Sequence, residues 1–481
     1  MSETTNDLPD GWVWATLGKV ITIRNGFAFK SRDYQDDGVL LIRQSNLTDT
    51  TIDIHGARYL PERFSIEYSD FIIQKGDVLI GMSGSIGKLC VYNLQMPALQ
   101  NQRTGLIQFF DKETGSFIRY FFKTLENHLI SKSKGVAVQN ISAKEIESCF
   151  IPLPPLPEQH RIVAKIEELL TQLDAGITAL KQAQAQLKRY RQSVLKAAVE
   201  GELTKAWREA HQDELEPASV LLERILKERR ERWEAEQLAK MEAKGKPPKD
   251  DTWKAKYKEP AAPDTSDLSK LPEGWCWATV GQVAKTALNL VDPKTMPNSY
   301  HIAPNHIEKE TGCLLPYTTV AQDKVTSSKH RFYPGQILYS KIRPYLAKAV
   351  LVDFEGVCSA DMYPINSFIN SRFLHRWMLT AKFTRLASDH QGRTVLPKIN
   401  QQALIRLPVP VPPHVEQQVI TDEVERCLSI VDEVEATIDI ELKRADRLRQ
   451  SILKDAFSGN LVPQDPDDEP ASVILERIKA D

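Results

Sequence analysis

The residues best suited to chemistry gather in short polar loops, and one of these loops contains glycines and a lysine, as a phosphate-binding loop does. It reads GMSGSIGKL at residues 81–89. A Walker loop has four residues between its first glycine and the Gly-Lys pair, followed by a Ser or Thr that binds magnesium. Five residues intervene here, and Leu89 follows the lysine. We therefore expect no ATP site, and instead a tight loop that holds Lys88 near a polyanion.

No other pattern in the sequence predicts catalysis. The chain has no Gly-x-Gly-x-x-Gly after an expected strand, no His-Glu-x-x-His and no Asn-Pro-Pro-Tyr of the adenine-methylating type. Its ten histidines are scattered, so no nucleophile and base can be paired. The six cysteines lie far apart without a Cys-x-x-Cys pair, which favours buried free thiols over a zinc site. We predict a chain that is not an enzyme and carries no metal or cofactor.

Basic and amide side chains cluster at the ends of several other loops. These loops are RNGFAFK (24–30), IRQSN (42–46), LQNQRTG (99–105), KGVAVQNIS (134–142), YSKIRPYLAK (339–348) and HQGRTVLPKIN (390–400). Arg reads guanine, and Asn or Gln reads adenine, through paired hydrogen bonds to base edges. Any one of these residues can equally be a solvated surface side chain, and Tyr345 can equally have a packing role, so the clustering carries the prediction. The candidate DNA contacts are Arg24, Lys30, Arg43, Gln44, Asn46, Lys88, Arg103, Lys341, Arg343, Tyr345, Arg393 and Lys398.

The charge is distributed unequally along the chain. The net charge of −2 over 481 residues is not typical of a protein that binds DNA alone. Residues 272–410 contain 16 Lys and Arg against 9 Asp and Glu, whereas residues 1–150 contain 16 against 17. The later stretch can attract phosphate by itself, and the earlier one needs local patches or a basic partner. No run of about 18 apolar residues predicts a membrane span, and MSETTNDLPD does not read as a signal peptide, so we expect a cytoplasmic protein.

The segments of sequence that flank the blocks containing these polar loops occur twice in the chain. The repeated pairs are LPDGWVWATLGKV (8–20) with LPEGWCWATVGQV (271–283), IPLPPLPEQ (151–159) with VPVPPHVEQ (409–417), RYRQSVLKAAVEGEL (189–203) with RLRQSILKDAFSGNL (447–461), and EPASVLLERI (216–225) with EPASVILERI (469–478). These segments are termed the frame below. Residues 21–149 (the first block) and 284–406 (the second block) show little mutual likeness. A constant frame with varied inserts predicts two modules that have the same kind of function but act on different targets. A duplicated enzyme would instead keep shared active-site residues inside the inserts.

Each half also contains a long helix with a seven-residue apolar repeat, which is typical of a coiled-coil seam. The seam residues are Ile166, Leu173, Leu180, Leu187 and Val194 in the first helix, and Val424, Val431, Ile438 and Ile452 in the second. Tyr190, Val434 and Leu448 fall at second seam positions. Pro157 suits a helix start, and Gly201 and Gly459 suit helix ends. About 37 residues would make a rod of roughly 55 Å. Two related amphipathic helices in one chain favour pairing with each other.

Short apolar runs bounded by Gly, Asp and Pro predict strands in both blocks, for example GVLLIR (38–43), DVLIGM (77–82) and QILYSKI (336–342). Residues 116–131 and 371–388 have helical spacing. The blocks are therefore expected to be α+β modules. Residues 227–270 begin as a charged helix and pass into a Lys-, Pro- and Asp-rich linker.

This order of parts resembles the specificity subunit of type I restriction–modification enzymes. The resemblance rests on the paired LP[DE]GW.WAT segments, IPLPPLPEQHRIVAKIEELL, VPVPPHVEQQVI, GDVLIGMSGSIGK, YSKIRPYLAKAV…SAD and GRTVLPKINQQAL, and it covers nearly the whole chain. It implies an α+β fold with two globular target-recognition domains, separated by a pair of long antiparallel coiled-coil helices in a pseudo-twofold repeat. The expected ranges are 1–155 and 271–411 for the target-recognition domains, 156–226 and 412–481 for the conserved helical regions, and 227–270 for the charged helix and linker.

The resemblance further implies a chain that reads two short DNA sequences across an unread spacer. It implies assembly with two methyltransferase subunits, which bind S-adenosylmethionine, and with restriction subunits that use ATP and Mg. None of these cofactors is expected on this chain. Three alternatives stay open at this point: the specificity subunit of a type IIB-like system, a coiled-coil scaffold without a DNA role, and a duplicated enzyme.

Overall fold

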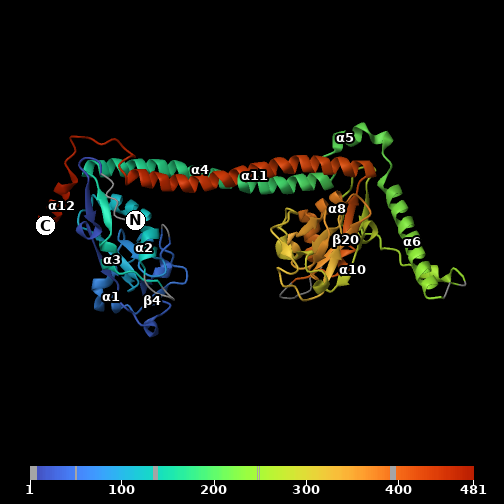
Figure 1. Ribbon diagram of the computed structural model, residues 1–481, viewed down its shortest axis with the longest axis horizontal. Helices are drawn as coiled ribbons and strands as arrows, with labels where there is room; N and C mark the ends of the chain where they lie inside the picture. Colours follow the sequence, from blue (N-terminus) through green and yellow to red (C-terminus); the bar gives the residue numbers. More distant parts are fainter. Residues whose placement is uncertain are drawn as a thin grey trace. The chain divides into compact units, whose positions relative to one another are not determined.

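The computed structural model describes residues 8–48, 51–133, 139–245, 248, 250–389 and 397–480. The chain forms two compact units that do not follow its linear order (Figure 1). Unit 1 combines Met1–Lys181 with Asp439–Asp481, and unit 2 is Gln182–Ile438. Each unit therefore contains one variable block together with parts of both long helices.

The first block folds into two four-stranded sheets, which confirms the expected α+β class. The strand orders are β2-β9-β6-β7 and β4-β3-β8-β5, and the β3–β8 pair is parallel. The strands are β2 (Ile21–Asn25), β3 (Val39–Ile42), β4 (Arg58–Leu60), β5 (Ile72–Ile73), β6 (Val78–Gly81), β7 (Leu89–Val91), β8 (Ala98–Gln100) and β9 (Thr104–Phe109). The helices are α1 (Phe64–Glu67), α2 (Gly115–Lys132) and α3 (Ala143–Glu147).

The second block repeats this topology, although its sequence shows little likeness to the first. Its sheets have the orders β12-β20-β17-β18 and β13-β16-β19-β14-β15, and the β14–β19 pair is again parallel. The strands are β12 (Ala284–Thr286), β13 (Leu290–Val291), β14 (Tyr300–Ile302), β15 (Thr318–Thr319), β16 (Lys329–Phe332), β17 (Ile337–Ser340), β18 (Ala349–Leu351), β19 (Gly356–Cys358) and β20 (Met362–Ser367). The helices are α7 (Val280–Val283), which ends the preceding frame segment, and α8 (Ser371–Met378), α9 (Ala381–Asp389) and α10 (Gln401–Leu404). In the first sheet, β2, β9, β6 and β7 correspond to β12, β20, β17 and β18. The second sheet contains one additional strand, β13.

The frame closes each block with a two-stranded antiparallel ladder. In unit 1, β1 (Val13–Thr16) pairs with β10 (Phe150–Leu153), and in unit 2, β11 (Cys276–Thr279) pairs with β21 (Pro408–Val411). The registers match, because Trp14 lies opposite Pro152 and Trp277 lies opposite Pro410. The repeated opening segment thus brings the two ends of each block together.

The long helices are α4 (Leu156–Val199) and α11 (His414–Ala456), and they pack against each other within each unit. In unit 1, Ile166 of α4 and Ile452 of α11 belong to one buried cluster. In unit 2, Val194 of α4 and Val424 of α11 do so. The helices run antiparallel in each unit: in unit 2, Arg191 pairs with Asp432, whereas Thr204, just beyond the end of α4, hydrogen-bonds to Glu416 near the start of α11.

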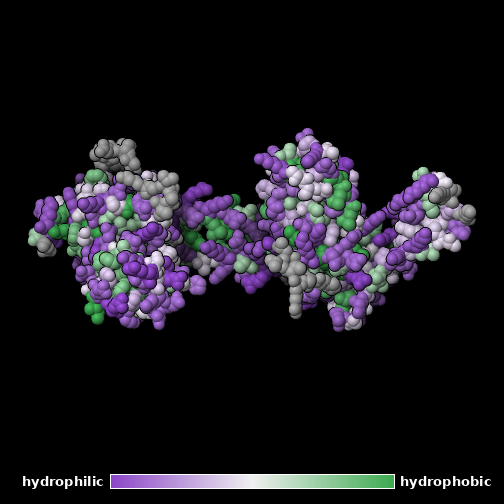
Figure 2. All heavy atoms as spheres, turned by 90° about the horizontal axis from the view of Figure 1, so that it is seen from below, coloured by the Kyte–Doolittle hydropathy of each residue, from purple (hydrophilic) through white to green (hydrophobic). Residues whose placement is uncertain are grey.

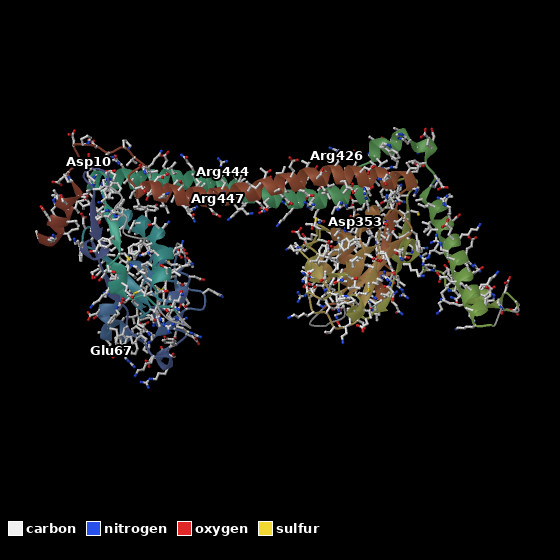
Figure 3. The ribbon with its side chains drawn as sticks, in the orientation of Figure 1. Asp10, Glu67, Asp353, Arg426, Arg444 and Arg447 are labelled. Atoms are coloured by element: carbon white, nitrogen blue, oxygen red, sulfur yellow. The ribbon has the colours of Figure 1, made fainter. Side chains whose placement is uncertain are left out.

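The predicted seam positions differ in burial along the two helices. Ile166, Val194, Val424, Val431, Ile438 and Ile452 are buried, whereas Leu173, Leu180 and Leu187 are half-buried. Tyr190, Val434 and Leu448 were expected on the seam, which is wrong, since they are 50%, 40% and 49% exposed. A straight helix turns by about 20° per heptad relative to a 3.5-residue repeat, so heptad positions drift away from the contact. Charged pairs cover the exposed sides of α11, among them Arg426 with Glu423 at 3.0 Å and Arg444 with Glu441 at 3.5 Å (Figure 3).

A second duplicated feature is the buried joint between each opening segment and the start of a long helix. Trp12 Nε1 donates to Glu158 Oε2 at 3.0 Å, and Trp275 Nε1 donates to Glu416 Oε2 at 2.8 Å. Both carboxylates are almost fully buried, with 1% and 0% of the residue exposed. Each unit therefore contains one buried tryptophan–glutamate pair with the same geometry.

The glycines that follow the long helices complete these joints, and their predicted role as helix ends is confirmed. Gly201 has φ +75° and Gly459 has φ +74°, which favours glycine. A Cβ on Gly459 would overlap Pro9, and one on Gly201 would overlap Pro272. Each opening segment is thus packed against the end of the long helix from the other half of the sequence.

The described residues between 227 and 270 include a helix and segments that pack against it. After α5 (Lys205–Ala210), α6 (Ala218–Ala243) continues through the expected boundary at residue 226. The later residues fold back on α6, because Trp253 stacks on Trp233 with ring centroids 6.0 Å apart and Tyr257 packs on the same ring at 5.3 Å. The second repeat ends instead with the short α12 (Ala471–Ala480).

Among the described helices, none is long and apolar enough to cross a membrane. Figure 2 shows mostly hydrophilic side chains on the visible face of each unit, interrupted by small apolar patches. Four of the six free cysteines are buried as expected, but Cys276 is half-buried and Cys313 is exposed.

Candidate nucleic-acid interface

In the first block, backbone hydrogen bonds tie the polar loops together at one edge of the sheets. Asn101 N–H donates to the Ile42 carbonyl at 3.0 Å, and Gln102 N–H donates to Phe27 at 3.0 Å. Met82 N–H donates to Arg103 at 3.1 Å. Ile141 N–H in turn donates to Met82 at 3.0 Å, so the described end of the 134–142 loop joins the same group.

The second block uses the same connections at the equivalent positions. Ser359 N–H donates to Ile302 at 2.8 Å, Lys341 N–H donates to Asp361 at 3.0 Å, and Ile399 N–H donates to Lys341 at 2.9 Å. Two topologically equivalent loop clusters therefore exist, one in each unit. Loops at a sheet edge are positioned by a rigid scaffold and can vary in side chains without changing the fold.

The predicted residues of the first block divide into structural and exposed groups. Asn46 is 2% exposed; its Oδ1 accepts the Arg43 N–H at 3.0 Å and its Nδ2 donates to the Asp53 carbonyl at 2.8 Å, so it holds the loop in shape. Arg24 is half-buried, donates to the Ile72 carbonyl at 3.0 Å, and burial lowers the pKa of its guanidinium. Lys30 and Arg103 are exposed, so they are the better placed of these to reach a ligand.

Three further predicted residues of the first block are intermediate in exposure between the structural and the exposed groups. Arg43 is half-buried, with its guanidinium carbon 5.9 Å from the centre of the Tyr34 ring. Gln44 is half-buried and lies against the glycine-rich loop, because a Cβ on Gly84 would come 3.0 Å from its Nε2. Lys88 at the end of that loop is half-buried. The structure therefore brings the Gln44 turn and the glycine-rich loop side by side.

In the second block, two predicted lysines surround one carboxylate. Lys398 Nζ lies 3.2 Å from Asp361 Oδ1, and Lys341 Nζ lies 3.7 Å from the same atom. Lys341 Nζ also donates to the Ala360 carbonyl at 2.5 Å. Asp361 occupies the position of Arg103 in the equivalent loop and was not among the predicted residues. Arg393 lies outside the described residues.

Arg343 and Tyr345 lie on an exposed and constrained turn. Arg343 is exposed, and its φ and ψ of 49° and 57° place it in the left-handed region before the 3₁₀ turn Pro344–Leu346. Its N–H donates to the Pro397 carbonyl at 2.8 Å. A left-handed conformation in a non-glycine residue costs of order 1–3 kcal/mol and concentrates at functional sites. Tyr345 is 49% exposed.

Sequence reasoning also missed Asn305. The turn Pro304–His306 is equivalent to Gln44–Asn46, because the His306 Nδ1 accepts the Ala303 N–H at 3.2 Å as Asn46 Oδ1 accepts that of Arg43. Asn305 is exposed at this turn. Its equivalence becomes visible only after the strands have been matched, since the two loops have no letters in common at the outer positions.

Comparison with known proteins shows the family to which the chain belongs. Residues 9–189 match the family model described as the type I restriction modification DNA specificity domain. The type I restriction enzyme EcoDI specificity subunit of Escherichia coli is 39% identical over 389 residues, which cover 79% of this chain and 79% of that protein. The chain belongs to the type I restriction enzyme specificity subunits. It is thus a DNA sequence-specificity subunit of a type I restriction–modification system.

Two further relatives extend the match over nearly the whole specificity subunit. The EcoBI specificity subunit of Escherichia coli is 27% identical over 493 residues, covering 98% of this chain and 92% of that protein. A chain from a structure of complex assembly and conformational transition in the type I R-M system aligns with a TM-score of 0.63 at 16% identity. It covers 94% of this chain and 99% of that chain, which supports the fold of the specificity subunit.

The specificity subunit shows no metal-binding group of three or more His, Cys, Asp or Glu among the residues that the structure describes. What its geometry offers instead is paired loop clusters with basic, amide and acidic side chains. Such side chains can contact phosphates and base edges.

Proposed function

We propose that the specificity subunit reads an asymmetric bipartite DNA target, with one loop cluster on each half-sequence. The observation that carries the proposal is that two blocks share topology and loop connections while their outward side chains differ. At equivalent loop positions, the first block has Arg43, Gln44 and Arg103, and the second has Ala303, Pro304 and Asp361. A shared fold whose loops carry different side chains suits the recognition of two different half-sequences in one DNA target.

The frame is the proposed scaffold for the partners. Two methyltransferase subunits would bind to the repeated segments, one for each half, and restriction subunits would complete the assembly. The repetition of these segments supports this, because identical partners require similar surfaces. The buried joints around Glu158 and Glu416 hold the repeated segments in the same geometry in both units. S-adenosylmethionine, ATP and Mg are assigned to the partner subunits, and this chain is proposed to contribute no catalytic group.

Competition binding by the assembled methyltransferase tests the division of labour. Arg103→Ala and Arg343→Ala each remove one exposed arginine from one cluster. If each arginine reads a base, its loss weakens binding by about 1–3 kcal/mol and relaxes one base pair in one half-sequence. If it contacts a phosphate, its loss weakens binding to all DNA sequences alike. The slope of the logarithm of the binding constant against the logarithm of the salt concentration then falls in magnitude by about one.

Duplexes mutated in one half-sequence at a time assign each variant to a half. Arg103→Ala and Arg343→Ala should act on opposite halves. If both changed the same half, or if neither changed binding, the proposed assignment of one cluster to each half would be wrong. Arg385→Ala, at an exposed position on α9, serves as the charge-matched control.

A further inference from the structure

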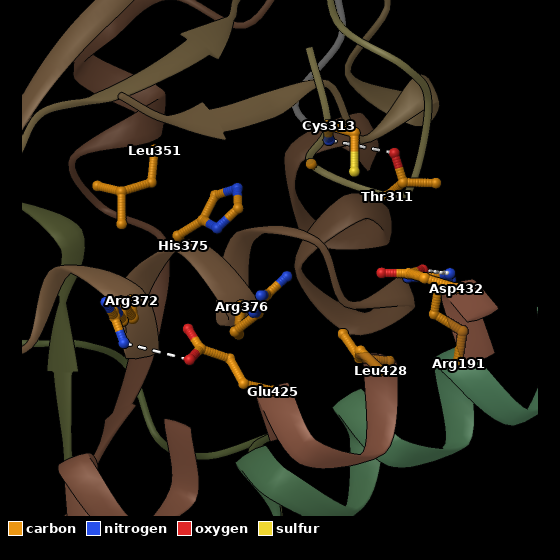
Figure 4. A pocket seen from close by; sticks show the side chains of 11 residues that line it. Arg191, Thr311, Cys313, Leu351, Arg372, His375, Arg376, Glu425, Leu428 and Asp432 are labelled. Atoms are coloured by element: carbon orange, nitrogen blue, oxygen red, sulfur yellow. Dashed lines mark hydrogen bonds and ion pairs between the residues drawn. The ribbon is translucent and has the colours of Figure 1, made fainter. Parts of the chain in front are cut away.

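Unit 2 contains a cavity of about 240 Å³ where α8 of the second block faces the long helices. Its charged lining consists of Arg191 from α4, Arg372 and Arg376 from α8, and Glu425 and Asp432 from α11 (Figure 4). The loop Thr311–Cys313 and the side chains of Leu351, His375 and Leu428 complete the wall.

The carboxylates of this cavity are already bound by two of its arginines. Arg372 Nη1 donates to Glu425 Oε2 at 3.2 Å. Arg191 Nη2 donates to Asp432 Oδ1 at 2.5 Å and also to Glu435, outside the lining, at 3.1 Å. Figure 4 shows both lining pairs as dashed lines. Neither carboxylate is left to neutralise a third guanidinium at hydrogen-bond distance.

Arg376 is that third guanidinium, and it forms no hydrogen bond or ion pair with any residue in the described part of the chain (Figure 4). It is half-buried, and burial lowers its pKa from the ordinary arginine value. The neighbouring His375 does not add a charge, because burial lowers its pKa to about 4. Glu425 and Asp432 oppose this lowering of the Arg376 pKa through their charge alone, and burial has the larger effect. A guanidinium without a hydrogen-bonded partner in a partly enclosed site favours binding of a negative group.

In unit 1, the residue equivalent to Arg376 has a hydrogen-bond partner. Matching the buried pair Phe117–Ile118 of α2 with Phe373–Leu374 of α8 places Tyr120 where Arg376 lies. The Tyr120 hydroxyl donates to Glu167 Oε1 at 3.5 Å, and Glu167 is the repeat equivalent of Glu425. In unit 2, Arg372 is hydrogen-bonded to the equivalent carboxylate, Glu425, and the charged Arg376 lines the cavity instead.

We infer that this cavity is a binding site for an oxyanion, either a carboxylate or a phosphate, with Arg376 as its principal donor. The anion occupies the space between α8 of the second block and the paired helices of unit 2. Among the described lining residues, Arg376 is the arginine that is not already hydrogen-bonded to a carboxylate. Two sources present this chemistry, a free anion and an acidic side chain of a partner subunit.

Equilibrium dialysis of the full chain with radiolabelled inorganic phosphate tests the site at constant ionic strength. Wild type should bind one phosphate per chain, and Arg376→Gln should bind it at least about tenfold more weakly, because a charge-assisted hydrogen bond is lost. Arg376→Lys keeps the charge and should retain most of the binding. Arg385→Gln on exposed α9 makes the same charge change outside the cavity and should bind as wild type does.

Repeating the dialysis with the chain assembled with its methyltransferase subunits separates the two sources. Phosphate bound in both states identifies a free anion as the occupant, and phosphate excluded only from the assembly identifies a partner carboxylate. If wild type bound no phosphate in either state, or if Arg376→Gln and Arg385→Gln bound it equally well, the inference would be overturned.

Discussion

Glu416 and Glu158 hold equivalent buried positions, but their partners differ in charge. Glu416 accepts hydrogen bonds from Trp275 at 2.8 Å, Thr204 at 2.7 Å and Arg208 at 2.7 Å. Glutamine has a single side-chain oxygen, so Glu416→Gln leaves at least one donor unpaired and removes the counter-ion of Arg208, whose side chain is 14% exposed. Removing one partner of a buried ion pair costs about 3–5 kcal/mol, and we expect a loss of that size.

The same substitution at Glu158 should have a small effect. Its partners are the neutral Trp12 and Gln464, at 3.0 and 3.4 Å, and it forms no ion pair with a described Lys or Arg. Glu158→Gln keeps an oxygen for Trp12, so we expect a change within about 1 kcal/mol at neutral pH.

The pH dependence of Glu158→Gln has a definite sign. Burial raises the pKa of Glu158, so the folded state binds a proton more tightly than the unfolded state does. The contribution of this group to wild-type stability is therefore fully present below the unfolded-state pKa. It is lost as the pH rises through the raised folded-state pKa. Glutamine lacks this term, so Glu158→Gln should compare best with wild type at neutral pH and less well in acid.

Hydrogen exchange measured by mass spectrometry reports the local free energy of opening in each unit. Glu416→Gln should speed exchange in frame peptides of unit 2 at both neutral and acidic pH, while Glu158→Gln should leave unit 1 close to wild type at neutral pH. Equal losses from the two substitutions, or a larger loss from Glu158→Gln, would refute the account of the two joints.

Three further predictions concern the helices. Val424→Asp, at a position with 0% exposure, should lower stability by several kcal/mol in denaturant unfolding, whereas Val434→Asp, at a position with 40% exposure, should change it by less than about 1 kcal/mol. Gly459→Ala should destabilise by about 1–3 kcal/mol, because its φ is +74° and the new Cβ would overlap Pro9; Gly176→Ala, with open space around it, should stabilise by about 0.5–1 kcal/mol. Insertion of four residues, about one helical turn, near Ala183 should lengthen the unread spacer and leave both half-sequences unchanged in methylation mapping, and an altered half-sequence would argue against a helix that sets the spacing.

The local elements of this fold could be predicted from the sequence. Apolar runs such as DVLIGM and QILYSKI become β6 and β17, and Gly201 and Gly459 follow the long helices as expected. These features depend on neighbouring residues. The common topology of the two blocks could not be predicted, because it depends on which distant strands pair, and different apolar residues can fill the same core.

The candidate site was predicted as a set of loops better than as a set of residues. Basic and amide side chains marked loops that the structure joins at one edge of the sheets. Residue type alone does not distinguish Asn46, whose side chain is hydrogen-bonded to backbone groups, from exposed Arg103. Asp361 lies in the SAD segment that contributes to the family resemblance, but it was not among the predicted contacts. Asn305 gave no signal in the sequence, since its position matters only through the strands that carry it.

One chain is proposed to read two different DNA half-sequences with two blocks of the same fold. The most direct test of this proposal is methylation mapping in cells that express the full chain with its methyltransferase and restriction subunits. The map should show one asymmetric motif of two short defined sequences separated by a spacer of fixed length. Replacing residues 284–406 with the corresponding block of a relative should then change one half-sequence and leave the other intact. A single uninterrupted motif, or a change in both halves, would contradict the claim.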